Sequence, residues 1–183
     1  INTSDTDIIN NSNFSKSSLA TQLKMVAKTI AARGTLNGCR QTFYVVQSGY
    51  DTHDDMLNRH AKLMTELDEA LGAFNLALNE LGVENNVTTF TMSDFARGLS
   101  SNGDGTDHGW GGHVMVMGGD IQGGKIYGEY PNLVNSDYIL NGGRFIPTTS
   151  CDEYFAELAL WFGASSSDLY DILPNIGNFW TPN

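Results

Sequence analysis

The sequence has little positive charge and no long apolar run. Lys and Arg number 10 against 21 Asp and Glu, which gives a formal net charge of −11. Nucleic acids and anionic membrane surfaces require a basic footprint, so this charge argues against both as partners. No run reaches the roughly 18 apolar residues of a transmembrane helix, so the sequence predicts no membrane span. The acidity is compatible with a secreted protein or with cation binding.

Targeting signals and common nucleotide motifs are also missing. No segment has the pattern of a signal peptide, and the chain starts at Ile1 rather than Met, so we expect a processed product or a fragment. The sequence contains no phosphate-binding GxxxxGK[ST] loop and no dinucleotide fingerprint. It also has no GxSxG elbow of a serine hydrolase.

Cysteine is rare, with only Cys39 and Cys151 in the chain. A bridge between them would close a long loop and contribute about 4–5 kcal/mol in the chain-entropy model. The alternative is a pair of buried free thiols. The sequence leaves both states open because it does not give the distance between the residues.

The composition that is present is that of one globular domain. Apolar residues make up 40% and aromatic residues 10% of the 183 residues, enough for a sizeable core. We expect a polar lead or connector over residues 1–14 and the domain over residues 15–183. Most of the 20 glycines fall between Gly98 and Gly143, which indicates tightly turned, functional loops there.

Apolar residues at three- and four-residue spacing predict the helices. One covers residues 16–33, with Ser15 or Ser17 as its cap, and a long one begins near Asp54 and ends before Gly82. Further helices are expected over residues 152–162 and 165–173, with Ser166 or Ser167 as the second cap. Asp54 or Asp55 in the first turn of the long helix would favour its positive end.

β-Branched and aromatic runs predict strands over residues 42–47, 87–92, 113–118 and, more briefly, 125–127. Strand, long helix and strand in this order form a βαβ unit, which implies a parallel sheet with helices outside. Ligands of such sheets bind at the carboxyl ends of the strands. Asp51 and Asp94 each follow a predicted strand, so we expect the two carboxylates to meet at one edge.

The histidines concentrate near the same edge. The candidate metal ligands are Asp51, His53, Asp94 and His108, a carboxylate and imidazole set that suits zinc best. Manganese, iron, calcium or magnesium are the other cations considered. For Asp51 the alternative is helix capping. An oxygen-rich loop from Asn102 to Asp107 only weakly matches a calcium site, because its bidentate acid is missing.

Three further residues are expected behind the ligands or on a bound anion. His60 lies on the apolar stripe of the long helix, where the alternative is a hydrogen-bonded core histidine. Asp107 adjoins His108. Arg97 could hold an anionic ester oxygen through its fork of donors, or form a surface ion pair. His113 is assigned to the strand it begins, with a structural role.

Several stretches resemble one bacterial family in order and spacing, from residue 14 to residue 179. They are FYVVQSGYDTHDD, ELDEALGAF, SDFARGLSSNGDGTDHGWGGHVMVMGG, GGKIYGEYPNL and DEYFAELALWFGAS with LPNIGNF. The family is catalogued as domain of unknown function 1501, and its members resemble exported proteins related to sulfatases and alkaline phosphatases. The resemblance implies a secreted, periplasmic or extracellular protein.

The resemblance also implies a fold and a site. The fold is a three-layer α/β sandwich, with a mostly parallel sheet and helices on both faces, of which this chain resembles the C-terminal half. Asp51 with His53, Ser93-Asp94 and His108-Gly109 resemble the metal-binding motifs, although Phe95 stands where a histidine is expected. The nucleophilic Ser or Thr belongs to the N-terminal half. A one-metal or lapsed site therefore fits better than a two-metal site.

Two functions follow. The first is a secreted, metal-dependent hydrolase-like protein acting on phosphate or sulfate esters, including small-molecule or polysaccharide esters, with the N-terminal half or another chain as partner. The second is a non-catalytic extracellular structural or interaction module that retains the fold. Because the chain resembles only the half without the nucleophile, enzymatic activity is left open, and the fold does not choose between the two functions.

Overall fold

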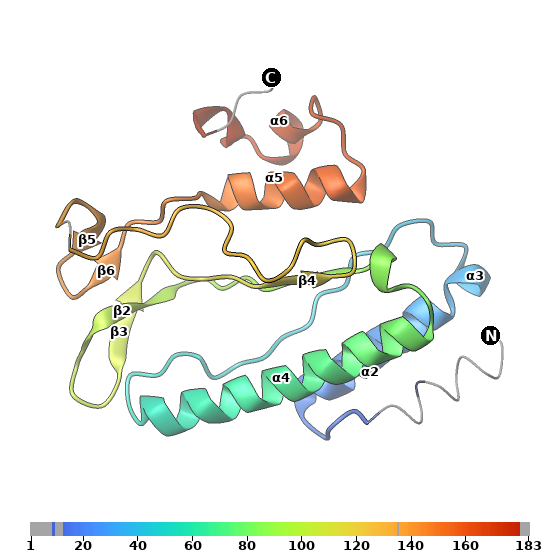
Figure 1. The fold of residues 1–183 in the computed structure, drawn as a ribbon, viewed down its shortest axis with the longest axis horizontal. Helices are drawn as coiled ribbons and strands as arrows, with labels where there is room; N and C mark the ends of the chain where they lie inside the picture. The colour runs from blue at the N-terminus through green and yellow to red at the C-terminus, as the bar shows by residue number, and fades with distance from the viewer. Residues whose placement is uncertain (1–8, 10–12, 135, 180–183) are drawn as a thin grey trace.

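Two helices that run in the same direction, α2 (Ser18–Ala31) and α4 (Met56–Glu80), form the base of the structure (Figure 1). The computed structural model describes residue 9, residues 13–134 and residues 136–179. Between the helices the chain returns along residues 41–52 without a turn or a bend. After α4 and the short helix η1 (Glu84–Asn86) it returns again through strand β1 (Thr88–Phe90).

Local sequence accounts for the ends of both helices. The hydroxyl of Ser17 accepts a hydrogen bond from the backbone N–H of Ala20 at 3.2 Å, as expected of a cap. A short helix, α3 (Arg33–Leu36), follows α2 and ends at Asn37. At the start of α4, Asp55 occupies the cap position with a φ of 44° and makes no capping bond with its side chain. Neither acid therefore lies in the first turn, contrary to the sequence prediction.

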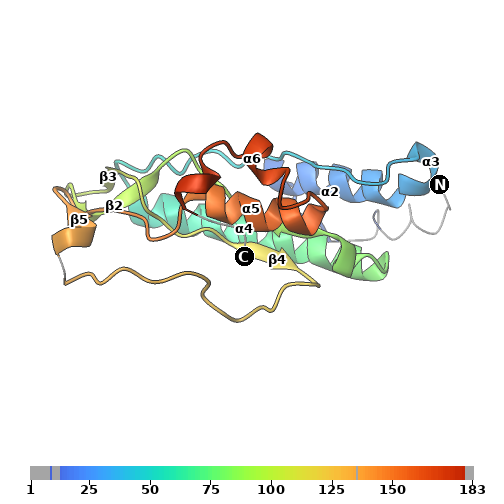
Figure 2. The same ribbon diagram turned by 90° about the horizontal axis from the view of Figure 1, so that it is seen from above.

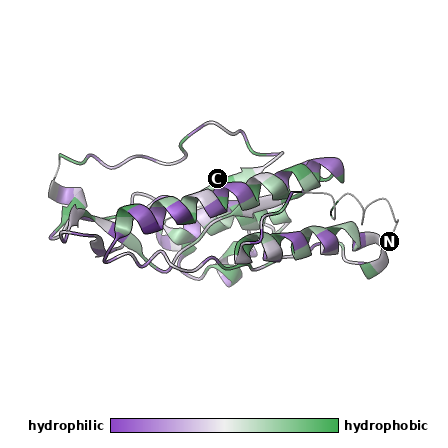
Figure 3. Ribbon diagram, turned by 90° about the horizontal axis from the view of Figure 1, so that it is seen from below, coloured by the Kyte–Doolittle hydropathy of each residue, from purple (hydrophilic) through white to green (hydrophobic). Residues whose placement is uncertain are grey.

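The core lies between α2 and α4. Its buried members are mostly alanine and leucine, and Phe74 is the largest side chain with almost no exposure. Small alanines let the helices approach closely while the larger residues fill the space between them. Figure 3 shows both helices striped with hydrophilic and hydrophobic residues, as amphipathic helices are. Ile9 is fully buried against this core. Most of the expected polar lead lies outside the described residues, but at Ile9 it is part of the core.

The described strands form three two-stranded antiparallel sheets. β1 pairs with β4 (Val116–Gly118), β2 (Ala96–Ser101) with β3 (Thr106–Gly109), and β5 (Ile139–Leu140) with β6 (Arg144–Phe145). A short helix, η2 (Ser136–Tyr138), precedes β5. No parallel ladder occurs in the part of the chain that the structure describes, so the three-layer parallel sandwich stays a prediction.

Several strand predictions differ from the structure. Residues 42–47 are extended but pair with no strand in the part of the chain that the structure describes, and residues 125–127 form no strand. The expected strand from His113 begins only at Val116. The glycine-rich segment from residue 96 to residue 109, for which the sequence predicts a loop, is the β2–β3 hairpin. Pairing depends on a partner strand, which local β-branched composition does not supply.

The C-terminal part covers the other side of the strands, as Figures 1 and 2 show from two directions. It contains α5 (Cys151–Phe162), α6 (Leu169–Ile172) and η3 (Ile176–Asn178). α5 begins with a capping box, in which Ser150 and Glu153 bond each other's backbone, and it confirms the predicted helix. Asp168, rather than either predicted serine, occupies the cap of α6. Cys39 and Cys151 are both free and exposed.

Candidate metal centre

The candidate site forms where the extended segment ends and α4 begins, against the β2–β3 hairpin. Hydrogen bonds join the two parts of the chain. Thr106 N–H donates to the Thr52 carbonyl at 3.3 Å, and Met56 N–H donates to the Asp104 carbonyl at 3.1 Å. The Asn102 side-chain amide donates to the His53 carbonyl at 3.0 Å. These bonds place the segment that carries Asp51 beside the strand that carries His108.

The tip of the hairpin is shaped by Asn102 and its glycines. The Asn102 side-chain oxygen accepts hydrogen bonds from the backbone N–H groups of Asp104 and Gly105, at 3.2 and 2.8 Å. This is the turn chemistry of asparagine, so the weak calcium-loop pattern is explained by a hairpin turn. A Cβ atom on Gly105 would lie 2.3 Å from the Thr52 carbonyl oxygen. Only glycine allows the hairpin to approach the Asp51 segment so closely.

One carboxylate oxygen is the centre of the cluster. Asp51 Oδ1 lies 3.0 Å from His53 Nε2, 2.8 Å from His108 Nε2 and 2.8 Å from Arg97 Nη1. The hydrogen bond from His108, ahead of that from Arg97, holds the pKa of Asp51 below its usual value. Asp51 therefore stays ionised at neutral pH and is ready to act as a ligand.

The two imidazoles are held face to face. The rings of His53 and His108 stack with centroids 5.0 Å apart. Phe95 stacks on His108 at 4.1 Å and 5°. Asp107 Oδ1 lies 3.5 Å from His53 Nδ1, on the opposite side of the ring from Asp51. This separation is not a hydrogen bond in the structure; a closer Nδ1–H···carboxylate bond would leave Nε2 free to bind a metal.

Arg97 is held by its neighbours rather than free. Its Nε donates to the Thr106 hydroxyl at 3.0 Å and its Nη1 donates to Asp51. Nη2 is buried and has no hydrogen-bond partner in the described part of the chain. The guanidinium therefore positions Asp51.

The structure brings together three of the four predicted ligands. The candidate ligand atoms of Asp51, His53 and His108 all lie within 4.8 Å of one another. Asp94 is exposed and lies outside this group, without a hydrogen bond or an ion pair among the described residues. His60 is also outside it and makes an edge contact with Tyr50 at 6.1 Å. His113 stacks on Tyr130 at 5.5 Å.

The three groups fit a divalent cation. In tetrahedral coordination with ligand distances of about 2.0–2.1 Å, neighbouring ligand atoms lie about 3.3 Å apart. The observed separations from Asp51 Oδ1 to the two imidazole nitrogens, 3.0 and 2.8 Å, are a few tenths of an ångström shorter. The third separation, between the two imidazole nitrogens, is within 4.8 Å. Three protein ligands leave a fourth position open, as in catalytic zinc sites.

Four supporting residues were missed or misjudged in the sequence. Phe95 counted only as a departure from a histidine motif, yet it stacks on His108. Thr106 holds Arg97, and Gly105 and Asn102 set the hairpin beside His53. The concentration of glycine in residues 98–112 was the signal for the close approach, but its partner, Thr52, could not be identified from spacing.

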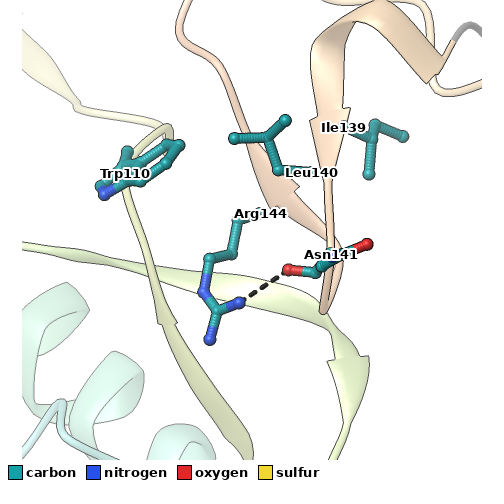
Figure 4. Close-up of a pocket in the computed structure, with 5 residues that line it drawn as sticks. All are labelled: Trp110, Ile139, Leu140, Asn141 and Arg144. Atoms are coloured by element: carbon teal, nitrogen blue, oxygen red, sulfur yellow. Dashed lines mark hydrogen bonds between the residues drawn. The ribbon is translucent and has the colours of Figure 1, made fainter.

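A shallow depression adjoins the cluster (Figure 4). It is lined by Trp110, Ile139, Leu140, Asn141 and Arg144. Arg144 Nε donates to the His108 carbonyl at 2.9 Å and Nη1 donates to the Asn141 carbonyl at 2.7 Å. The β5–β6 hairpin is thereby fixed to the strand that carries His108. Trp110 is 64% exposed and offers an apolar surface close to the candidate ligands.

The arrangement defines an exposed Asp–His–His cluster between the segment that leads into α4, which carries Asp51 and His53, and the β2–β3 hairpin, which carries His108. The chain belongs to the family described as protein of unknown function (DUF1501), which matches residues 4–138. No curated protein and no solved structure matches the chain. Among the described residues, no helix has the length and apolar character to cross a membrane.

Proposed function

We propose that the protein binds one divalent cation through Asp51, His53 and His108 and is a hydrolase-like protein of phosphate or sulfate esters. Zinc suits this donor set best, because two imidazoles and one carboxylate are frequent zinc ligands. The observation that carries the proposal is the convergence of the three groups from two segments far apart in sequence. Asp94, predicted as a fourth ligand, is not part of this site.

The neighbouring residues support a role beyond simple binding. A bound cation would supply Lewis-acid stabilisation of a negatively charged ester oxygen. Arg97 fixes Asp51 through a hydrogen bond. Asp107 lies beside His53, and Phe95 stacks on His108. The exposed indole of Trp110 can contact the organic part of an ester.

The placement of the family with sulfatases and alkaline phosphatases, and with it a periplasmic or extracellular location, belongs to this proposal. In that class the nucleophile comes from another half of the domain, so a second polypeptide part is the expected partner. The proposal therefore separates two properties. Residues 1–183 bind the cation, and ester cleavage requires an activated hydroxyl that none of the cluster residues provides.

The alternative function is a non-catalytic extracellular module. It is favoured by the openness of the cluster, whose Asp51, His53 and His108 side chains are 55%, 46% and 50% exposed. Substrate pockets usually enclose the reacting group and exclude water. An exposed site of this kind can also bind a cation for a structural purpose.

Metal binding and ester cleavage can be measured side by side. The metal-free chain is titrated with zinc, and the loaded chain is assayed with 4-nitrophenyl phosphate and 4-nitrophenyl sulfate, with and without a chelator. The hydrolase-like function predicts chelator-sensitive cleavage that disappears in the Asp51→Ala/His108→Ala variant. Zinc binding without cleavage is the result expected both of a non-catalytic module and of a hydrolase-like site that lacks its nucleophile-bearing partner, and a folded chain that does not bind zinc rejects the proposed cation site.

A further inference from the structure

The extended segment between α2 and α4 has one edge that is open for pairing. The side-chain amide of Gln22 bonds both backbone groups of Val46, accepting from N–H at 2.9 Å and donating to C=O at 2.8 Å. In an extended chain both groups of one residue point to the same side, and those of its neighbours point to the other. The Val46 side is therefore the one that faces α2.

The opposite edge carries the backbone groups of Phe43, Val45 and Gln47. None of these N–H or C=O groups has a hydrogen-bond partner in the part of the chain that the structure describes. A row of unpaired groups in an extended segment is a template for another strand. Gln47 uses its side chain, not its backbone, to bond the Leu63 carbonyl of α4.

Strand β1, which packs on the same α2–α4 helix pair, also has an open edge. Thr91 N–H donates to the Met115 carbonyl, so the alternation directs the backbone groups of Phe90 away from β4. Val45 and Val87 both pack against the core of α2 and α4. The extended segment and β1 run in the same direction, back along α4 (Figure 1), but do not bond each other.

Charge defines the chemistry of the strand that would fit. Residues 41–50 and 87–93 contain no charged side chain, whereas the chain as a whole carries −11. Asp51 and Asp94 follow directly after these two uncharged segments. A charged side chain of an added strand would lose solvation against these uncharged segments without gaining a partner. Exposed Tyr44, at 81%, adds an apolar surface beside the edge.

We propose that the edge formed by Phe43, Val45 and Gln47 binds an uncharged, β-branched segment of another polypeptide as an added β-strand. Backbone hydrogen bonds provide the affinity and alternate side chains the selectivity, as in other strand-addition complexes. The added strand forms a new two-stranded ladder with this segment over the α2–α4 helix pair. The proposal is independent of the metal site, since none of its residues is a candidate ligand. A second copy of this chain is disfavoured as the occupant because each copy carries −11.

The test uses the complete chain and a blocked synthetic peptide, Thr-Val-Thr-Val-Thr-Val-Thr. Binding is followed by isothermal calorimetry, and hydrogen exchange is measured at individual amides. We expect binding, with new protection at the amides of Phe43, Val45 and Gln47. A peptide methylated on alternate backbone nitrogens keeps the side chains but loses one hydrogen-bonding edge, and should not bind.

Two proline variants provide the matched control. Val45→Pro removes an N–H on the open edge and should weaken peptide binding about fivefold or more, the value of one net hydrogen bond. Tyr44→Pro removes an N–H on the α2 side and should leave the affinity unchanged. The proposal is overturned by equal binding of the methylated peptide, by no binding, or by full protection of these amides in the chain alone. A dimer that Val45→Pro dissolves would identify a second copy as the occupant, which also overturns it.

Discussion

At the scale of single residues, Asp51 organises the site. Its Oδ1 atom meets two imidazole nitrogens and one guanidinium nitrogen, all at 3.0 Å or less. A carboxylate that accepts from several donors keeps its charge at lower pH, in agreement with its lowered pKa. The same oxygen is the atom through which Asp51 would bind a cation.

Asp51→Asn should therefore reduce zinc affinity by about 10- to 100-fold or more, because it removes the anionic ligand and keeps the side-chain volume. The matched control is Asp54→Asn, since Asp54 is an exposed acid that pairs with Arg59 outside the cluster. Calorimetric titration with zinc measures both variants. Equal loss of affinity in the two variants would show that general charge, rather than the cluster, attracts the cation.

Tyr154 provides a prediction for alkaline pH. Burial raises the pKa of Tyr154 to about 12, and its hydroxyl donates to the Thr91 carbonyl. The unfolded chain releases this proton near the ordinary pKa of 10, whereas the folded chain keeps it to about 12. The contribution of Tyr154 to the unfolding free energy is therefore fully present below pH 10 and is lost as the pH rises toward 12. Tyr154→Phe should flatten the fall in unfolding free energy over this range. Urea denaturation at several pH values tests it, and an unchanged slope would contradict the role of burial.

Gly105 tests whether the close approach of the hairpin matters. A Cβ at this position meets the Thr52 carbonyl and the His53 backbone, so Gly105→Ala should destabilise the chain by about 1–3 kcal/mol and lower zinc affinity. Gly72 is the control, because it lies in α4 and an added Cβ would have no atom within 4 Å. Gly72→Ala should stabilise the chain by about 0.5–1 kcal/mol. Thermal unfolding and zinc titration of both variants distinguish the two effects.

At the scale of elements, the helices followed from the sequence more closely than the strands. Hydrophobic periodicity gave α2, α4 and α5 to within a few residues, because a helix satisfies its own backbone bonds and shows its buried face in its spacing. The segment at residues 42–47 has strand composition but no partner strand among the described residues. The β2–β3 hairpin was hidden because its glycines and polar residues resemble a loop, while long-range bonds to Thr52 and Met56 support it.

The α2–α4 contact should dominate the stability of the chain. Phe74 is 2% exposed at this contact, so Phe74→Ala is expected to lower the unfolding free energy by about 3–5 kcal/mol. Leu76 lies two residues further along α4 and is 62% exposed. Leu76→Ala should change the unfolding free energy by only about 0.5 kcal/mol. Urea denaturation compares the two, and similar losses would mean that the exposed face of α4 is also covered in solution.

At the scale of the whole molecule, the sequence predicted part of the site. The two acids at strand ends pointed to one edge, and Asp51, His53 and His108 do converge. Asp94 does not: it is exposed and lies outside the cluster, although its neighbour Phe95 stacks on His108. Arg97 and Asp107 were placed near the ligands from spacing alone. Their contacts with Asp51 and His53 depend on hairpin register, which spacing does not specify.

Family membership and the geometry of the site support different kinds of statement about this protein. The family match establishes kinship over residues 4–138, while the geometry of three side chains leads to the proposed chemistry. The open edge at Phe43, Val45 and Gln47 adds a surface for a partner strand. The proposed cation site and the proposed strand-accepting edge are separate features, and each can be removed without changing residues of the other.

X-ray absorption spectroscopy of the zinc-loaded chain tests the central claim most directly. The account predicts one zinc per chain, coordinated by two imidazoles and by oxygen at about 2.0–2.1 Å, with the imidazole signal reduced to one in His108→Ala. Sulfur ligation by Cys39 or Cys151, or a spectrum without imidazole, would contradict the assignment of Asp51, His53 and His108 as the metal ligands.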